Sequence, residues 1–310
     1  MSALRIALRI ARHFIGAPRS IAEPADRGPG IPGAPLLELR GISKRFGAVQ
    51  ALTEVRFDVS AGEVVALVGD NGAGKSTLIK VISGIYRPDA GTIRWQGREV
   101  SVGSPNEAAA LGIATVYQDL ALCDNLDVVA NLFLGRELTA GGALSPLGRL
   151  GALGVMDEVT MERQAVEVLR RLSVKIPSVR IPIASLSGGQ RQSVAVARSV
   201  LGDNQVVLLD EPTAALGVAQ THEVLGLIKR LRGQGLGVVL ISHNLANVFE
   251  VADRITVLRL GRWVGTYDAR ATSHEQLVAF MTGAVPGSGE EHAASSKPHP
   301  ASSEKAGAAP

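Results

Sequence analysis

The apolar residues of this chain follow two different spacings. Three segments alternate apolar and polar positions, which is typical of antiparallel strands with one solvated face; they span residues 36–40, 54–59 and 92–96. Four short runs dominated by Val, Leu and Ile indicate strands buried on both faces, at Val64–Val68, 206–209, 238–241 and 255–258. Apolar residues at helical spacing predict helices over Lys75–Ile82, 159–171, 190–201 and 221–232.

The order of these segments predicts an α/β fold. A succession of strand, helix and strand requires crossover connections, which join parallel strands of one sheet. The mean hydropathy of +0.19 fits strands that are buried on both faces. No apolar run approaches the roughly 18 residues that a membrane-spanning helix needs.

The two ends of the chain differ from its middle. In residues 1–15, Arg5, Arg9 and Arg12 recur at helical spacing, which favours either a basic amphipathic helix on an anionic membrane surface or an unstructured start. Residues 17–34 are rich in Pro and Gly, as in a linker. We therefore expect a flexible segment at 1–34, one folded domain at 35–284, and a disordered low-complexity tail at 285–310.

Composition and charge exclude several classes of protein. With 46% hydrophobic and 20% charged residues, the chain is not intrinsically disordered, and a single cysteine excludes a disulfide scaffold. The net charge of +3 arises in the first 30 residues, where five arginines stand against Glu23 and Asp26. The rest is near neutral, so its charge gives no indication of nucleic-acid binding.

A phosphate-binding loop follows the first buried strand. The loop has the pattern G-x-x-x-x-G-K-S and leads into a helix; its residues are Gly69, Asp70, Asn71, Gly72, Ala73, Gly74, Lys75, Ser76 and Thr77. Its glycines allow backbone N–H groups to turn toward phosphate oxygens, and the helix N-terminus adds a positive dipole end. Lys75 is predicted to reach the outer phosphates and Ser76 to ligate Mg²⁺. The alternative is a glycine-rich turn that matches by chance.

A pair of acidic residues ends the second buried run. Asp210 and Glu211 follow an apolar strand, whose carboxyl end opens at the phosphate crevice. Asp210 is predicted to hold Mg²⁺ and Glu211 to orient or deprotonate the attacking water. Alternatively, the two carboxylates cap a helix whose first turn contains Pro212.

A second glycine-rich helix N-terminus comes shortly before that strand. It consists of Ser187, Gly188, Gly189 and Gln190, in which Ser187 is a predicted cap and the free N–H groups favour an anion. Together with the upstream phosphate loop, this motif resembles the signature of ATP-binding-cassette (ABC) ATPases. The resemblance covers about residues 35–284. It implies a cassette with a mixed sheet core, an N-terminal antiparallel β subdomain and an α-helical signature subdomain.

Three further residues take roles from this resemblance. Phe46 is similar to the aromatic residue that stacks on adenine, Gln118 to the glutamine that reaches the metal and the attacking water, and His243 to the switch histidine at the γ-phosphate. Each has a structural alternative: Phe46 as a core residue, Gln118 as a surface residue and His243 as a capped strand end. The resemblance also implies ATP and Mg²⁺ as cofactors. It further implies a head-to-tail homodimer, in which the signature of one chain closes over the nucleotide of another.

Several stretches resemble the ATPases of ribose-, xylose- and fructose-type sugar importers. They include residues 114–122, 131–137 and 280–284, and Gly217 where most ABC ATPases have Asp. The chain has room for one cassette only, like the fructose-type form. The resemblance implies a peripheral subunit on the cytoplasmic face of the inner membrane, which hydrolyses ATP for a membrane permease served by an extracytoplasmic sugar-binding protein.

Two other functions and one local ambiguity stay open at this point. The chain could be a soluble ABC ATPase without a transport role, or a phosphate-loop kinase for a small molecule, which would not need the signature motif. Residues 119–137 are expected to meet the permease. Their apolar side chains are either an exposed docking surface or a small helical core: Leu120, Leu122, Leu126 and Phe133.

Overall fold

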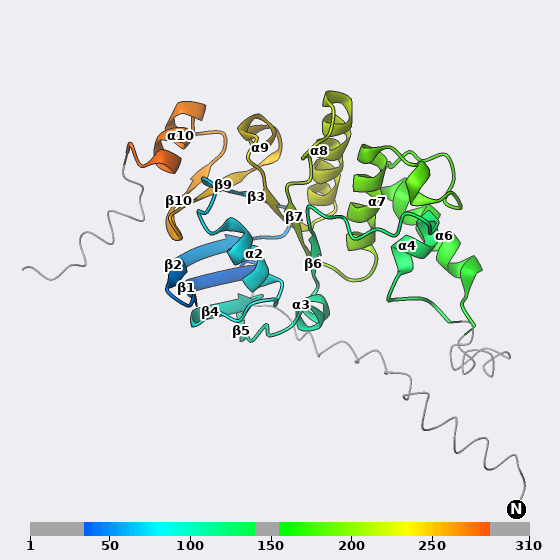
Figure 1. The fold of residues 1–310 in the computed structure, drawn as a ribbon, viewed down its shortest axis with the longest axis horizontal. Helices are drawn as coiled ribbons and strands as arrows, with labels where there is room; N and C mark the ends of the chain where they lie inside the picture. Colours follow the sequence, from blue (N-terminus) through cyan, green and yellow to red (C-terminus); the bar gives the residue numbers. More distant parts are fainter. Residues whose placement is uncertain (1–33, 140–154, 286–310) are drawn as a thin grey trace, which may run out of the picture.

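The computed structural model describes residues 34–139 and 155–285. Ten strands form one twisted sheet in the order β5-β4-β1-β2-β10-β9-β3-β8-β7-β6 (Figure 1). The strands are β1 (Leu37–Phe46), β2 (Val49–Val59), β3 (Val64–Val68), β4 (Ala90–Trp95), β5 (Arg98–Val100), β6 (Ile113–Val116), β7 (Val206–Asp210), β8 (Gly237–Ile241), β9 (Arg254–Arg259) and β10 (Arg262–Asp268). The helices are α2 (Lys75–Ile82), α3 (Pro105–Leu111), α4 (Val128–Phe133), α6 (Glu158–Arg171), α7 (Gly188–Val200), α8 (Val218–Gly233), α9 (Leu245–Val251) and α10 (His274–Thr282).

One half of the sheet is antiparallel, as the alternating segments predict. Strand β1 pairs with β2 and β4, and β4 pairs with β5. Leu37, Leu39 and Ile42 face inward and are fully buried, while Arg40 between them is exposed. Because side chains alternate across a strand, one face of this half closes a core and the other meets solvent.

The other half is parallel around β3. Strands β9, β3, β8, β7 and β6 run in the same direction, joined by crossover helices. All five residues of β3 are buried: Val65 and Leu67 contribute to the core beneath the antiparallel half, and Val64 to the core under the helices. Burial on both faces explains the unbroken apolar runs in the sequence.

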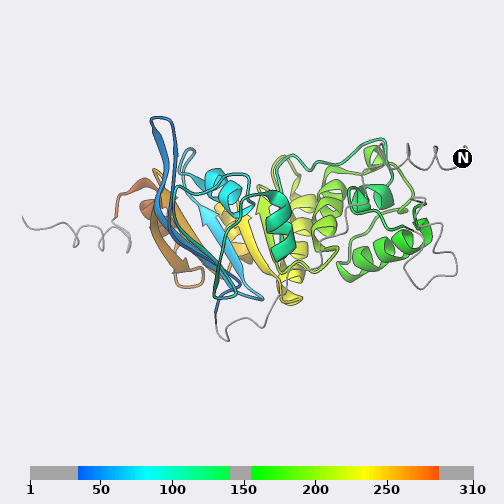
Figure 2. The ribbon, with the colours of Figure 1, turned by 90° about the horizontal axis from the view of Figure 1, so that it is seen from below.

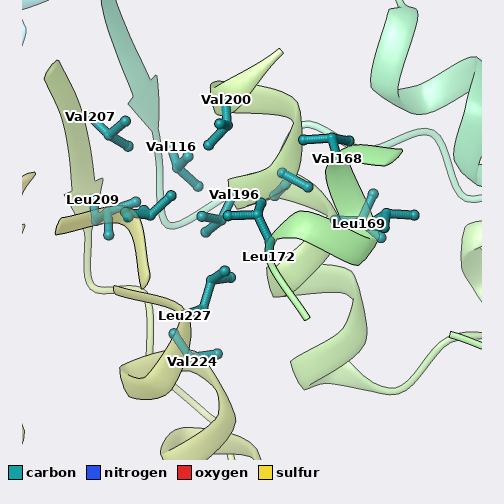
Figure 3. Packing of buried hydrophobic residues seen from close by; sticks show 14 of the residues in the cluster. Val116, Val168, Leu169, Leu172, Val196, Val200, Val207, Leu209, Val224 and Leu227 are labelled. Atoms are coloured by element: carbon teal, nitrogen blue, oxygen red, sulfur yellow. The ribbon is translucent and has the colours of Figure 1, made fainter. Parts of the chain in front are cut away.

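Two large cores divide the molecule. Helix α2 packs between the antiparallel strands and the parallel ones. Helices α4, α6, α7 and α8 pack together on the opposite face and extend beyond the sheet (Figure 2). Figure 3 shows this second core, where Leu172 and Val196 meet Leu227 and Leu209. The predicted α/β cassette with an antiparallel β subdomain and a helical subdomain is thus confirmed.

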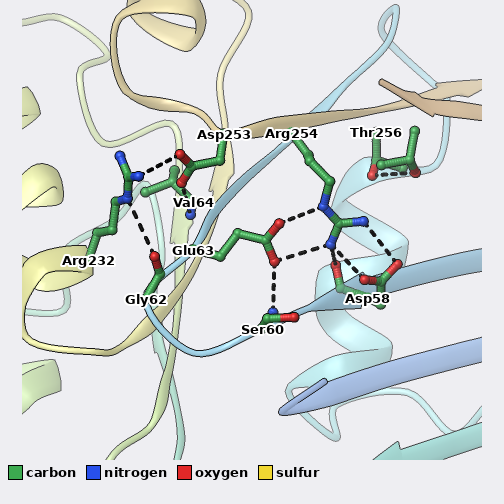
Figure 4. A network of polar contacts seen from close by, with 10 residues as sticks. Asp58, Ser60, Gly62, Glu63, Val64, Arg232, Asp253, Arg254 and Thr256 are labelled. Atoms are coloured by element: carbon green, nitrogen blue, oxygen red, sulfur yellow. Dashed lines mark hydrogen bonds and ion pairs between the residues drawn. The ribbon is translucent and has the colours of Figure 1, made fainter. Parts of the chain in front are cut away.

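A polar network braces the amino-terminal ends of the parallel strands (Figure 4). The guanidinium of Arg254 donates to Glu63 and to Asp58, with Nη2 2.6 Å from Asp58 Oδ2. Burial alone would raise the pKa of Glu63, but its bonds to Arg254 and to the Ser60 amide hold that pKa below its usual value. This network lies at the opposite end of β3 from the phosphate loop, so it fixes the strand without touching the site.

The structure corrects the interpretation of residues 119–137 as an exposed apolar surface. Phe133 is 3% exposed, and Leu120 and Leu122 are half-buried against the helical core. The amide of Asn131 is fully buried and bonds the backbone N and O of Cys123. This segment therefore folds on its own core, and its apolar residues stabilise it from inside.

Two other predictions meet different outcomes. The interpretation of Asp210 and Glu211 as helix caps is wrong, because α8 begins only at Val218, with Gly217 as its N-cap. The predicted basic helix at 1–15, the linker up to residue 33 and the tail after Val285 lie outside the described residues.

Candidate functional site

The phosphate loop leaves β3 in a conformation that its glycines make possible. Gly69 has a φ of 149° and Gly74 a φ of 100°. A Cβ on Gly74 would lie 2.9 Å from the Ala51 carbonyl oxygen, and one on Gly69 would overlap the Leu258 carbonyl. Both positions therefore exclude side chains, because the loop is pressed against β2 and the end of β9.

The N-terminus of α2 is open. Gly74 is its N-cap and provides no side-chain hydrogen bond, so the first N–H groups of the helix have no cap from their own chain. Lys75 Nζ donates to the carbonyls of Gly69 at 2.6 Å and Asp70 at 3.0 Å. Burial lowers the pKa of Lys75, although Glu211, Asp70 and Asp210 act in the other direction. A phosphate here would meet a dipole end and a cation held by neutral carbonyls.

Asp210, Glu211 and His243 lie together at the carboxyl edge of the parallel strands. Asp210 ends β7, and burial first, then the charge of Glu211, raise its carboxyl pKa. Glu211 has a φ of 50°, and its N–H bonds the Ile241 carbonyl of β8. His243 Nδ1 lies 2.8 Å from Glu211 Oε2. Hence His243 does more than cap a strand end: its ring contacts the carboxylate beside the phosphate loop.

Gln118 and Phe46 lie at the margins of this site. Gln118 follows β6, whose Val116 is paired with Leu209 of β7, so it leaves the sheet at the same edge as Asp210. Gln118 is exposed, so its side chain is open to solvent at this edge of the sheet. Phe46 ends β1 and is 41% exposed. The interpretation of Phe46 as a core residue is therefore wrong.

The signature motif forms the N-terminus of α7, in the helical part of the molecule. Ser187 Oγ accepts the Gln190 N–H at 3.3 Å, and Gln190 Oε1 accepts the Ser187 N–H at 3.0 Å, which is a full capping box. A Cβ on Gly189 would lie 2.9 Å from Gln220 Cβ, so this glycine lets α7 and α8 meet closely. Helix α7 belongs to the helical core and α2 to the other, so the fold places the two glycine-rich N-termini in different halves of the chain.

Sequence reasoning missed Arg191. Its Nη2 donates to the Ala184 carbonyl at 2.9 Å and its Nε to the Leu186 carbonyl at 3.1 Å, which fixes the turn that leads into Ser187. Its Nη1 also lies 3.4 Å from Asp124 Oδ1. The sequence offered one clue to this role: Arg191 stands four residues after the predicted N-cap Ser187, within reach of the turn before it.

The fold and these motifs can be compared with known proteins. The family model of the ABC transporter domain matches residues 52–214, which runs from β2 through the phosphate loop and signature to Glu211 and the turn after it. The chain belongs to the ABC transporter ATPases. It is therefore an ATP-binding, ATP-hydrolysing cassette, and the small-molecule kinase loses its support.

Curated relatives carry the match over nearly the whole cassette. The fructose import ATP-binding protein FrcA of Rhizobium meliloti is 47% identical over 251 residues, covering 81% of this chain and 95% of that protein. The xylose/arabinose import ATP-binding protein XylG of Sulfolobus acidocaldarius is 45% identical over 247 residues, covering 80% and 94%. A putative ribose/galactose/methyl galactoside import ATP-binding protein of Burkholderia cenocepacia is 42% identical, but only 46% of its length is matched.

Solved structures agree on the fold. The crystal structure of an ABC transporter cassette in its ADP conformation has a TM-score of 0.67 and 25% identity, covering 80% of this chain and 95% of that one. A dimeric cassette in a post-hydrolysis state, bound to ADP and Pi, has a TM-score of 0.61 and 24% identity, covering 76% and 100%. The second likeness concerns the fold alone.

Proposed function

We propose that this ATPase energises the uptake of a monosaccharide of the fructose, xylose or ribose type through a membrane permease. The observation that carries the proposal is the 47% identity to a fructose import ATP-binding protein over 95% of that protein's length. The aligned region spans nearly all of that protein, so the two cassettes are expected to perform the same task. No helix within residues 34–139 and 155–285 is long and apolar enough to cross a bilayer.

The nucleotide is held along the phosphate loop. The triphosphate takes the backbone N–H groups of residues 69–77 and the ammonium of Lys75, which exchanges its two carbonyl partners for phosphate oxygens. The adenine stacks on the exposed ring of Phe46. The charge on the nucleotide favours the protonated form of Lys75 and opposes the lowering of its pKa by burial.

The residues around the loop suit Mg²⁺. The hydroxyl of Ser76, the amide oxygen of Gln118 and the carboxylate of Asp210 are hard oxygen donors, and Mg²⁺ takes few protein ligands beside phosphates and waters. The described residues contain no group of three or more His, Cys, Asp or Glu that would form an all-protein cage. Mg²⁺ bound here supplies charge neutralisation for the phosphoryl transfer.

Glu211 and His243 handle the attacking water. Glu211 Oε2 accepts the water's proton or orients the water toward the outer phosphorus. His243 Nδ1, at 2.8 Å from the same oxygen, keeps that carboxylate aimed at the water. The backbone bond from Glu211 N to the Ile241 carbonyl holds the strained residue in place.

A second copy completes the site. Because α7 and α2 belong to different cores of one chain, we expect the Ser187–Gln190 turn to close over the nucleotide of another copy in a head-to-tail pair. Residues 119–137 contact the permease at the cytoplasmic face of the inner membrane, with the sugar delivered by an extracytoplasmic binding protein.

Uptake by living cells tests the transport role. The gene for this chain is deleted from the cells that encode it, and uptake of labelled fructose, xylose and ribose is measured at low sugar concentration. The measurement is repeated after the wild-type chain or the Lys75→Ala variant is returned to the cells. We expect uptake of one of these sugars to fall and to return only with the wild-type chain. Unchanged uptake of all three, with intact ATPase activity of the purified chain, would leave a soluble ABC ATPase as the better description.

A further inference from the structure

The loop that joins α2 to β4 contacts the end of β1 at two points. The rings of Tyr86 and Phe46 meet edge to face, with centroids 5.0 Å apart and an interplanar angle of 67°. Asp89 Oδ1 lies 2.7 Å from Lys44 Nζ, and its Oδ2 accepts the Arg45 N–H at 2.7 Å. Both contacts involve the residues that lead up to and include Phe46, so the loop clamps this strand end.

The same loop is anchored on the phosphate-binding helix. The N–H of Tyr86 donates to the Lys80 carbonyl in the last turn of α2 at 2.9 Å. Lys80 Nζ lies 5.6 Å from the centre of the Tyr86 ring, within range of a cation–π contact. The Tyr86 ring is half-buried against the core that surrounds α2. Helix α2 thus carries the phosphate loop at one end and the support of Phe46 at the other.

The Phe46 ring stands at an open strand end. Phe46 is the last residue of β1, paired with Val49 across a hairpin end, and Val49 is 65% exposed. Its other ring contact is with Lys44, whose Nζ is 5.6 Å from the ring centre and is itself held by Asp89. A free ring at a strand end would sample several rotamers, and a bound base would have to fix it at a cost in entropy.

We infer that Tyr86 is a positioning residue for the nucleobase: its ring holds Phe46 in the orientation on which the base of ATP stacks. The inference rests on the proposed role of Phe46. It assigns to the α2–β4 loop a task in nucleotide recognition, because one helix sets the phosphate loop and the base platform relative to each other. Tyr86 itself acts through Phe46 and need not touch the nucleotide.

Binding of two probes to the full chain tests this role. MgATP carries a base, and inorganic tripolyphosphate with Mg²⁺ carries the phosphates alone. Tyr86→Leu is expected to raise the dissociation constant of MgATP about fivefold and to leave that of tripolyphosphate within about twofold. A loss of fold or a displaced phosphate loop would weaken the binding of both probes alike. The ratio of the two dissociation constants therefore reports on the base alone.

Three companion variants fix the interpretation. Tyr86→Phe keeps the ring and is expected to restore wild-type affinity for MgATP. Phe46→Leu should raise the MgATP constant about tenfold by removing the stacking partner, and adding Tyr86→Leu to it should change little further. Ile85→Ala, at the exposed neighbour in the same loop, is the matched control and should bind both probes as the wild type does. If Tyr86→Leu melts far below the wild type, Tyr86→Met replaces it.

Two results would overturn the inference. One is an unchanged MgATP constant in Tyr86→Leu while Phe46→Leu weakens binding; the other is full additivity of the two substitutions. Failure of the proposed function has a different mark, since cells that lack the chain would then take up all three sugars as before, whatever the binding constants of the two probes.

Discussion

The two glycine-rich helix N-termini of this chain differ in how their N–H groups are satisfied. At α2 the N-cap is Gly74, which has no side chain to offer. At α7 the N-cap is Ser187, which forms a complete capping box with Gln190. Glycine near a helix start therefore has two outcomes here. The N-terminus of α2 is open to an anion, whereas the N-terminus of α7 is capped by its own side chains.

The difference indicates which helix binds the nucleotide and which completes the site. Helix α2 has Lys75 in its first turn and the Asp210 and Glu211 carboxylates within electrostatic reach. At α7 the cation of the first turn is Arg191, which bonds the backbone carbonyls of Leu186 and Ala184 and so braces the entry to the helix. We therefore expect α2 to bind ATP in a single chain, and α7 to act only when a second copy brings it over that nucleotide.

Removing the cation from α2 should have the largest effect. Lys75→Ala deletes the ammonium that meets the outer phosphates, and we expect the dissociation constant of MgATP to rise about 100-fold or more. Fluorescence titration with a labelled ATP measures it, and Lys75→Arg, which keeps the charge, is the control. Tight binding by the Ala variant would mean that the phosphates lie elsewhere.

Changing α7 should separate binding from turnover. Ser187→Ala removes a hydroxyl that the proposed dimer aims at the partner's nucleotide, so we expect ATP turnover to fall about tenfold to 100-fold. The MgATP constant of the isolated chain should stay within about twofold. Steady-state phosphate release and titration supply the two numbers. An equal loss in both would contradict the division of labour between α2 and α7.

Stability should respond to the same contrast. Ser187→Ala also breaks the capping box of α7, which costs about 1 kcal/mol of unfolding free energy. Ser76→Ala, in the first turn of the uncapped α2, removes an exposed hydroxyl and should cost less than about 0.5 kcal/mol. Urea unfolding of the nucleotide-free chain measures both. Equal costs would mean that the capping box contributes nothing to folding.

The half-buried carboxylate of Asp210 beside α2 gives the smallest effect and a defined pH dependence. Because the native pKa of Asp210 is raised, the wild type loses stability as pH rises from the unfolded value near 3.8 through the raised value. Asp210→Asn removes this loss, so its melting temperature should exceed that of the wild type near neutral pH. The gap should close as pH falls toward 3.8, and a constant gap would point to another cause.

The elements with one strong local signal could be predicted from the sequence. The bounds of β3 and α2 agree with the predicted segments because an apolar run, a glycine loop and an amphipathic helix follow without interruption. Strands β6 and β10 were not predicted. Strand β6 has only four residues, and β10 mixes polar and apolar residues without regular alternation. For the segment that contains α4, the sequence left an exposed surface and a small helical core both open, because only tertiary packing tells a buried run from an exposed one.

The separate motifs of the site could be predicted from the sequence, but most contacts between them could not. Phosphate loop and acidic pair follow from strand ends, where parallel strands deliver their side chains to one edge. The positive φ of Glu211 and its contact with His243 depend on β7 and β8 being neighbours, which no local pattern states. The contact between Tyr86 and Phe46 joins segments far apart in the sequence in the same way.

The most direct test of the proposed pairing is the mass of the chain with nucleotide bound and hydrolysis blocked. Glu211→Gln removes the carboxylate that accepts the water's proton but leaves α2 and α7 intact, so MgATP should bind and stay. Light scattering on a sizing column with saturating MgATP is predicted to give twice the mass of one chain, and one chain's mass without nucleotide. A single-chain mass in both conditions would contradict the account in which α7 of one copy completes the site of another.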